Sequence, residues 1–251
     1  MSRITSSADS AHLETFAEDG FIRIPGAFGG SVLDQCVTAI YREPRKHGVA
    51  ADDPATWTRP VVRFFCPEGQ CFADAGSARP LWSLYDQLLG EGNWIRRLAV
   101  GGTVPVRFPS CEDPGDAGWH IDGSYEINGR YFVNVHSRTR ALLTLFLFSD
   151  IGAQDAPTEI AVGSHRDVPP LLAPYGSNGV FFGDLDLTEI IDRRPKALAT
   201  GKAGDVYVCH PFLVHRATWP HRGHRPRLLA QPEIGHQQPF ALHPGSPRSL
   251  V

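Results

Sequence analysis

Two side chains that can hold a metal ion, His120 and Asp122, stand one residue apart in the segment GWHIDG at positions 118–123. Because alternate residues of a strand point to the same face, the imidazole and the carboxylate can both be presented on one side. Glycine-rich, turn-like sequence surrounds the pair, as expected at the mouth of a barrel. The pair alone is explained more simply by a surface turn with a hydrogen bond from histidine to aspartate, so further residues must support a metal site.

A third candidate ligand, His215, ends the segment GDVYVCHPFLVH. Two histidines and one carboxylate form the facial triad of non-haem Fe(II) oxygenases, which leaves positions on iron for a co-substrate and O₂. If that co-substrate is 2-oxoglutarate, its far carboxylate needs a cation, and the arginine fork binds carboxylates bidentately. Arg225 and Arg227 follow His215 by 10 and 12 residues. His210 is the other histidine of the segment, and we expect it to end a strand beside the site.

Most of the chain resembles the phytanoyl-CoA dioxygenase family of Fe(II)/2-oxoglutarate-dependent oxygenases. The likeness begins with FAEDGFIRIPGAFG near the N-terminus and continues through WHIDG and APTEIAVGSHR. It closes with GDVYVCHPFLVHRA and RPRLL. Each piece is common by itself, but the ordered set is specific.

The resemblance implies that His120, Asp122 and His215 are the iron ligands. It also implies that Arg227 anchors 2-oxoglutarate, because this arginine opens an apolar strand and can point inward. Arg225 is the alternative anchor, since the family's spacing falls between the two.

Two further positions concern the co-substrate. Thr144, in the run ALLTLFLF, either contributes a hydroxyl to 2-oxoglutarate or is simply satisfied on a strand face. Ala217 stands where several family members carry a serine that helps to hold the co-substrate carboxylate, which leaves the second contact open. The carboxylate of Asp122 is retained, whereas related halogenases replace it with a small residue. Hydroxylation or another two-electron oxidation is therefore favoured over halogenation.

Composition excludes several classes of protein. The chain has 251 residues, of which 42% are hydrophobic and 20% charged, with a net charge of −3, so it is neither a disordered polyelectrolyte nor a typical nucleic-acid binder. Its five cysteines form no CxxC pair, which argues against a disulfide framework or a zinc ribbon. The longest apolar run, 141–148, is far shorter than the roughly 20 residues of a membrane span. We expect a soluble, cytoplasmic protein that binds a small molecule, with no nucleic-acid or membrane partner.

The elements that must position these residues fall into two parts. Up to about residue 97, helical spacing at 31–42, with Ser31 as N-cap, and at 81–89 predicts helices. From about residue 98 to 235, short β-rich runs separated by Gly, Pro, Asp and Asn predict strands. These runs are VPVRF, YFVNVHS, ALLTLFLF, EIAVG, GVFFG, DVYVC and RLLAQ.

No linker or repeat divides the chain, so we predict a single domain over 1–251. Its fold class is mainly β (α+β), a double-stranded β-helix or jelly-roll barrel with packed N-terminal helices. The expected function is that of an Fe(II)/2-oxoglutarate-dependent dioxygenase, an oxidoreductase that uses O₂ to oxidise, most simply to hydroxylate, a small organic metabolite and releases succinate and CO₂.

Two other functions fit the same residues. A cupin-type metal-dependent isomerase or hydrolase is one, because zinc also accepts two histidines and a carboxylate. A non-catalytic small-molecule binding protein on the same fold is the other. The connections 43–80, 123–140 and 166–200 are expected to select the substrate, and no cation cluster dominates them, which favours a small hydrophobic or polycyclic metabolite of secondary metabolism. Desaturation, ring closure and epimerisation remain open beside hydroxylation, as does the oligomeric state.

Overall fold

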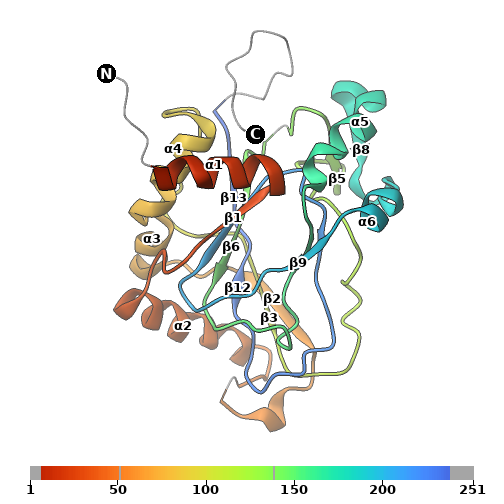
Figure 1. The fold of residues 1–251 in the computed structure, drawn as a ribbon. Helices are drawn as coiled ribbons and strands as arrows, with labels where there is room; N and C mark the ends of the chain where they lie inside the picture. The colour runs from red at the N-terminus through yellow and green to blue at the C-terminus, as the bar shows by residue number, and fades with distance from the viewer. Residues whose placement is uncertain (1–6, 51, 138, 238–251) are drawn as a thin grey trace.

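The protein is described by a computed structural model that covers residues 7–50, 52–137 and 139–237 (Figure 1). Strand β6 (Leu142–Leu147) lies at the centre of the largest sheet and is buried along its whole length. This burial on both faces explains why its sequence is apolar without alternation. The strands around it are all antiparallel to their partners: β10 (Val206–Cys209) pairs with one edge of β6 and with β1 (Phe21–Ile24), while β12 (Leu229–Ala230) and β13 (Glu233–Ile234) pair with the other edge.

Two strands continue this sheet beyond β12. Strand β2 (Val61–Phe65) pairs with β3 (Thr103–Arg107). Isolated bridges then join β3 to the β12 segment, between Arg107 and Arg227 and between Thr103 and Gln231. The large sheet therefore extends, through these bridges, from β1 near the N-terminus to β2.

A second sheet carries one of the candidate ligands. It consists of β11 (His215–Arg216), β7 (Glu159–Ala161) and β9 (Lys196–Leu198). His120 bridges to His215 through two backbone hydrogen bonds of 3.0 and 2.9 Å, so the GWHIDG segment runs along its edge. A further small sheet is formed by β4 (Tyr125–Ile127), β5 (Arg130–Val133) and β8 (Val180–Phe181).

Alternation along β6 divides the apolar core into two layers. Leu143 and Leu145 pack with Ile160 and Leu213, residues that come from β7 and from the segment before β11, and so fill the space between the two sheets. Phe146, on the opposite face of β6, packs against the helices. Two antiparallel sheets with a shared core and helices on the outer face form the architecture predicted from the sequence.

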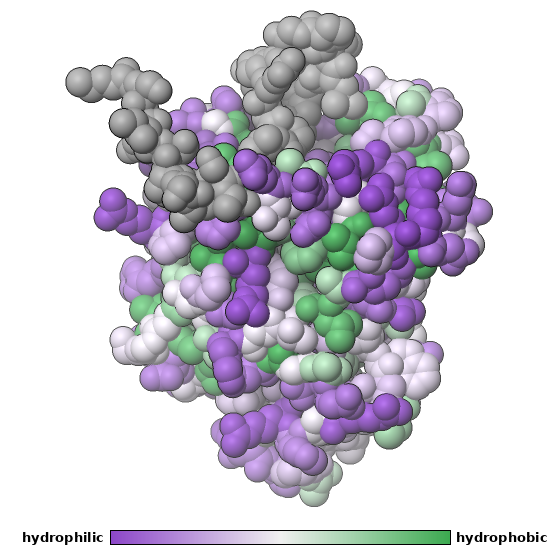
Figure 2. All heavy atoms as spheres, viewed as in Figure 1, coloured by the Kyte–Doolittle hydropathy of each residue, from purple (hydrophilic) through white to green (hydrophobic). Residues whose placement is uncertain are grey.

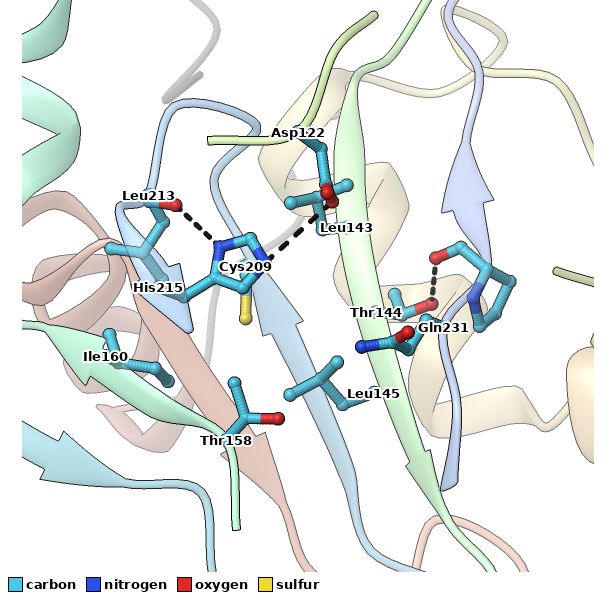
Figure 3. Close-up of a pocket in the computed structure, with 11 residues that line it drawn as sticks. Asp122, Leu143, Thr144, Leu145, Thr158, Ile160, Cys209, Leu213, His215 and Gln231 are labelled. Atoms are coloured by element: carbon cyan, nitrogen blue, oxygen red, sulfur yellow. Dashed lines mark hydrogen bonds and ion pairs between the residues drawn. The ribbon is translucent and has the colours of Figure 1, made fainter. Parts of the chain in front are cut away.

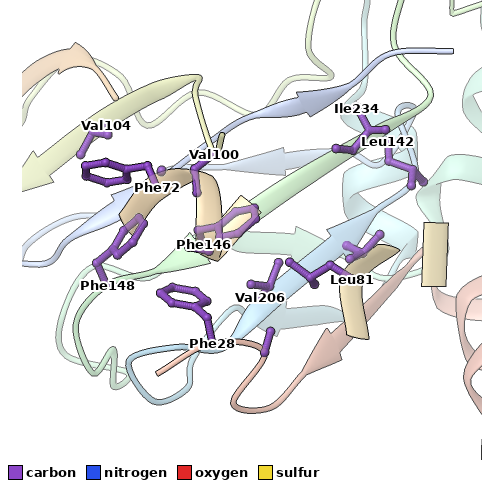
Figure 4. Close-up of a cluster of buried hydrophobic side chains, with 14 of the residues drawn as sticks. Phe28, Phe72, Leu81, Val100, Val104, Leu142, Phe146, Phe148, Val206 and Ile234 are labelled. Atoms are coloured by element: carbon purple, nitrogen blue, oxygen red, sulfur yellow. The ribbon is translucent and has the colours of Figure 1, made fainter. Parts of the chain in front are cut away.

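The helices cover the outer face of the large sheet (Figure 1). They are α1 (Ser7–Asp19), α2 (Gly30–Arg45), α3 (Gln70–Gly76) and α4 (Arg79–Leu89). Figure 4 shows Phe28, Phe72 and Leu81 packed with Phe146 and Val206 of the sheet. None of the helices in the described part of the chain combines the length and the apolar character that a membrane span requires.

Shorter helices lie on the other side of the molecule. They are α5 (Val168–Leu172) and α6 (Thr188–Arg193), together with the 3₁₀ helices η2 (Ser164–Arg166), η3 (Ala173–Asn178) and η4 (Phe182–Asp184). A further 3₁₀ helix, η1 (Pro54–Thr56), lies beside α2. Hydrophilic residues gather over the α6 side in Figure 2. There Arg193 and Arg194 both pair with Asp167.

Most predicted elements are confirmed, with differences at their ends. Helix α4 ends at Leu89 before Gly90, as predicted. Helix α2 is longer than expected: it begins at Gly30, so Ser31 lies inside it, and it continues to Arg45 because two basic residues in its last turn complement the helix dipole. The segment 43–80, treated above as a connection, contains β2 and α3. Strands β1 and β2 of the N-terminal part both join the large sheet.

Candidate metal centre and adjoining cleft

The three predicted ligands meet at the edge of the second sheet. The Nε2 atom of His120 lies 3.7 Å from Oδ1 of Asp122, and the Nε2 atom of His215 lies 3.9 Å from Oδ2 of the same carboxylate. Two donors that each bind one ion at about 2.1 Å are at most about 4.2 Å apart, so both pairs are within reach of a single metal ion. Of the described residues, these three are the one group of possible ligands close enough together to hold an ion.

Backbone carbonyls fix the orientation of both imidazoles. Nδ1 of His120 donates to the carbonyl of Gly118 at 2.8 Å, and Nδ1 of His215 donates to that of Leu213 at 2.9 Å. This assignment of the protons leaves both Nε2 lone pairs free and directed at the carboxylate. Figure 3 shows His215 between these two partners, Leu213 on one side and Asp122 on the other.

The protonation states also suit metal binding. Burial lowers the pKa of His215, which keeps this imidazole in the neutral form that ligates metals. Desolvation raises the pKa of Asp122, but Arg140, His215 and His120 lower it by more, and the result lies below the ordinary value. Nη1 of Arg140 is 3.7 Å from Oδ2 of Asp122. The carboxylate is therefore ionised before any metal arrives.

A cleft of about 850 Å³ adjoins the triad and contains a pair of buried arginines. Arg107 and Arg227 are directly opposite one another, with backbone hydrogen bonds of 3.1 and 2.8 Å between them, so their side chains lie on the same face of the sheet. Only 3% of Arg107 and 2% of Arg227 is exposed. The backbone alone thus places two guanidinium groups side by side.

The guanidinium group of Arg227 makes no ion pair within the described part of the chain. Its Nη1 donates to the carbonyl of Ala156, its Nε has no hydrogen-bond partner, and no ion pair to it is found there. Burial, with Arg107 and Arg63 nearby, lowers the pKa of Arg227, and the charge of Asp155 opposes this shift. Asp116 pairs with both Arg107 and Arg63, so one carboxylate serves these two neighbouring cations. A buried arginine without an ion pair favours binding of a carboxylate.

The alternative anchor and the predicted threonine are placed differently. Arg225 is exposed and lines a separate hollow with Tyr41 and Arg42 of α2. Thr144 pairs with Val208, whose side chain packs against the helices, and its hydroxyl donates to the carbonyl of Pro232 at 2.8 Å (Figure 3). Thr144 also lines the small cavity beside Asp122 and His215. Because its hydroxyl proton is donated to Pro232, a hydrogen bond from Thr144 to a co-substrate would have to replace this one, and the predicted contact stays a prediction.

Three cleft residues were not singled out from the sequence as site residues. Arg63, Arg97 and Arg140 line the same cleft as the triad. Alternate residues of a strand share a face, so Arg63 could have been assigned to the cleft only if the pairing of β2 with β3 had been known. Ala217 also lines the cleft and, as noted from the sequence, offers no hydroxyl. His210 instead stacks with His165 at 4.8 Å between ring centres, among buried residues outside the cleft.

Comparison with solved structures identifies the fold. No family model matches the chain, and no curated protein matches it in sequence. It is similar to SnoK, a non-heme alpha ketoglutarate dependent carbocyclase from nogalamycin biosynthesis, with 15% identity over 93% of this chain and 84% of SnoK and a TM-score of 0.61. It is also similar to the epimerase SnoN in complex with Fe3+, alpha ketoglutarate and nogalamycin RO, with 16% identity over 91% and 84% of the two chains and a TM-score of 0.62.

A third neighbour is HygX from Streptomyces hygroscopicus with nickel, 2-oxoglutarate and hygromycin B bound. The identity is 19% over 94% of this chain and 88% of HygX, with a TM-score of 0.56. At these identities the likeness establishes the fold alone, a jelly roll that the chain shares with these three neighbours. The prediction of fold class is therefore confirmed.

Proposed function

We propose that the protein is an Fe(II)- and 2-oxoglutarate-dependent dioxygenase that oxidises a small organic metabolite, with release of succinate and CO₂. The observation that carries this proposal is the presence, in one cleft, of a His–Asp–His triad and a buried arginine that makes no ion pair with any of the described residues. The structural neighbours with iron or nickel and 2-oxoglutarate support it.

Each group has a defined role in the proposed site. His120, Asp122 and His215 would hold iron, which supplies O₂ activation coupled to decarboxylation of the co-substrate. Arg227 would bind the far carboxylate of 2-oxoglutarate, and Arg107 beside it would supply the second contact that Ala217 does not provide. Arg225 has no part in this arrangement.

Apolar side chains border the triad on one side. Leu143, Leu145, Ile160 and Leu213 line a small cavity behind Asp122 and His215 (Figure 3). Arg107 and Arg227 are themselves only 3% and 2% exposed, and this burial strengthens their electrostatic attraction to the carboxylate of a co-substrate.

The reaction outcome depends on where the substrate carbon lies, which the triad does not determine. Neighbours on the same fold include a carbocyclase and an epimerase. Hydroxylation is the simplest outcome, and the nogalamycin and hygromycin neighbours support a role in secondary metabolism.

Turnover of 2-oxoglutarate tests the proposal. Protein reconstituted with Fe(II) in air should convert 2-oxoglutarate slowly to succinate even without substrate, measured by chromatography of the acids. His120→Ala, Asp122→Ala and His215→Ala should each reduce succinate formation by about 100-fold or more, because each removes a ligand. Normal turnover in any of the three would refute the assignment, and a zinc-dependent activity without 2-oxoglutarate would support the isomerase or hydrolase instead.

A further inference from the structure

The outer wall of the cleft is built from one face of β2 and β3. Arg63 and Phe65 are alternate residues of β2, and their partners Pro105 and Thr103 belong to the face of β3 that also carries Arg107. All five line the cleft. The opposite face of these strands, which includes Val62 and Val104, is in the helix-covered core. One face of β2 and β3 thus belongs to the apolar core, and the other face presents cationic and aromatic side chains to the cleft.

Positive charge exceeds negative charge along this cleft. The charged side chains that line it are the five arginines Arg63, Arg97, Arg107, Arg140 and Arg227 and the three carboxylates Asp116, Asp122 and Glu233. Two positive charges therefore remain. A bound divalent metal and a 2-oxoglutarate dianion cancel one another, so the excess persists when both are present.

Besides Arg227, two arginines at the outer end of the cleft are only partly neutralised. Arg63 shares Asp116 with Arg107, so one carboxylate serves two cations. Arg97 reaches Glu233 only at 3.9 Å, and that carboxylate is bound more closely by Arg140 at 3.0 Å. The side chains of Arg63 and Arg97 are 42% and 30% exposed, which leaves both accessible to a ligand.

The phenyl ring of Phe65 lines the cleft together with Arg63 and Arg97. Phe65 is 84% exposed, although it belongs to a strand whose other face is buried. Phe65, Arg97 and Gly102 also line a second hollow, so they form the ridge between it and the cleft. An exposed phenyl ring on such a ridge costs hydration free energy unless a ligand covers it.

We propose that the cleft selects a small organic anion. A carboxylate, phosphate or sulfonate of the substrate binds Arg63 and Arg97, and its apolar or aromatic body lies on Phe65. This inference rests on the proposed function, since it assigns the substrate class of the same site. It changes the expectation of a small hydrophobic or polycyclic metabolite by adding an anionic group, because the sequence did not show that these arginines line one cleft.

A pair of fluorescent probes separates charge from hydrophobicity. Anilinonaphthalene sulfonate carries an aromatic body and an anionic group, whereas N-phenylnaphthylamine has a similar body without charge. Protein loaded with zinc and 2-oxoglutarate should bind the sulfonate at least about tenfold more tightly, which corresponds to the roughly 1.4 kcal/mol of one charged contact. Added salt should weaken the sulfonate alone.

Arginine and phenylalanine variants locate the binding site. Arg97→Gln should weaken the sulfonate about tenfold and leave the neutral dye unchanged, while Phe65→Ser should weaken both dyes. Arg96→Gln is the matched control, because Arg96 stacks on Trp82 at 5.1 Å and is outside the cleft lining. It should change neither dye.

Equal affinity for the two dyes, absence of sulfonate binding, or equal effects of Arg97→Gln and Arg96→Gln would overturn this inference. The dye titrations use zinc and no turnover, so they are independent of the oxygenase test. If succinate forms but the dyes do not discriminate, the substrate class is wrong and the proposed function stands. If the dyes discriminate but no succinate forms, the proposed function fails.

Discussion

Backbone carbonyls determine the chemistry of the two candidate histidine ligands. Because Gly118 and Leu213 each accept a hydrogen bond from Nδ1, both rings present Nε2 to Asp122. Residue types and spacing made these three residues candidates, the family resemblance implied them as a ligand set, and the structure brings them close enough to hold one ion. Residue types and spacing did not predict Arg140, whose Nη1 lies 3.7 Å from the carboxylate, since it comes from a loop without a sequence motif.

The two candidate anchors for 2-oxoglutarate can be told apart residue by residue. Arg227→Gln should raise the dissociation constant of 2-oxoglutarate at least about tenfold, because a charged hydrogen bond contributes about 1.5–3 kcal/mol. Arg225→Gln removes the same charge from an exposed position and should leave the constant unchanged. Isothermal titration of zinc-loaded protein gives both values. A large effect of Arg225→Gln with none from Arg227→Gln would reverse the assignment.

At the scale of elements, Gly20 connects α1 to β1 and approaches the site. Its φ is +82°, and an added Cβ would lie 2.4 Å from Nδ1 of His165 and 2.8 Å from Cδ1 of Leu213. Its carbonyl also accepts a hydrogen bond from His210. A side chain here would disturb the chain just before β11, which carries His215.

Two glycine substitutions separate backbone strain from steric overlap. Gly26 also has a positive φ, +56°, but has nothing within 4 Å of an added Cβ. Gly26→Ala should therefore lower the free energy of unfolding by about 1 kcal/mol. Gly20→Ala should lower it by about 2–4 kcal/mol, because overpacking is added to the strain. Urea denaturation measures both, and equal losses would show that the contacts with His165 and Leu213 are unimportant.

The sequence alone predicted those helices and strands whose hydrophobic periodicity is strong. Helix α4 and the seven β-rich runs from VPVRF to RLLAQ all correspond to observed elements. Strand β2 and helix α3 were missed, because each is short and depends on long-range partners: β2 pairs only with β3, and α3 packs on α2. Single-sequence periodicity carries no information about such partners.

The whole molecule assembles the site from distant parts of one sheet system. Strand β1 near the N-terminus pairs with β10, and β2 joins β3 beside the segment of Arg227. We therefore propose that residues 7–237 form a single domain, since the helical and β-rich parts share a sheet; the two ends of the predicted range, 1–251, lie outside the described residues. This pairing of strands explains how a chain with a net charge of −3 can have a cationic cleft. The strand register could not be predicted from composition.

Anaerobic titration with Fe(II) and 2-oxoglutarate tests the central claim most directly. The account predicts a weak visible charge-transfer band from the chelated complex, because three protein ligands leave positions on iron for 2-oxoglutarate. The band should be absent in Asp122→Ala and should need more 2-oxoglutarate in Arg227→Gln. An undiminished band in Asp122→Ala, or no band in wild-type protein that has bound iron, would contradict the assignment of this cleft as an oxygenase site.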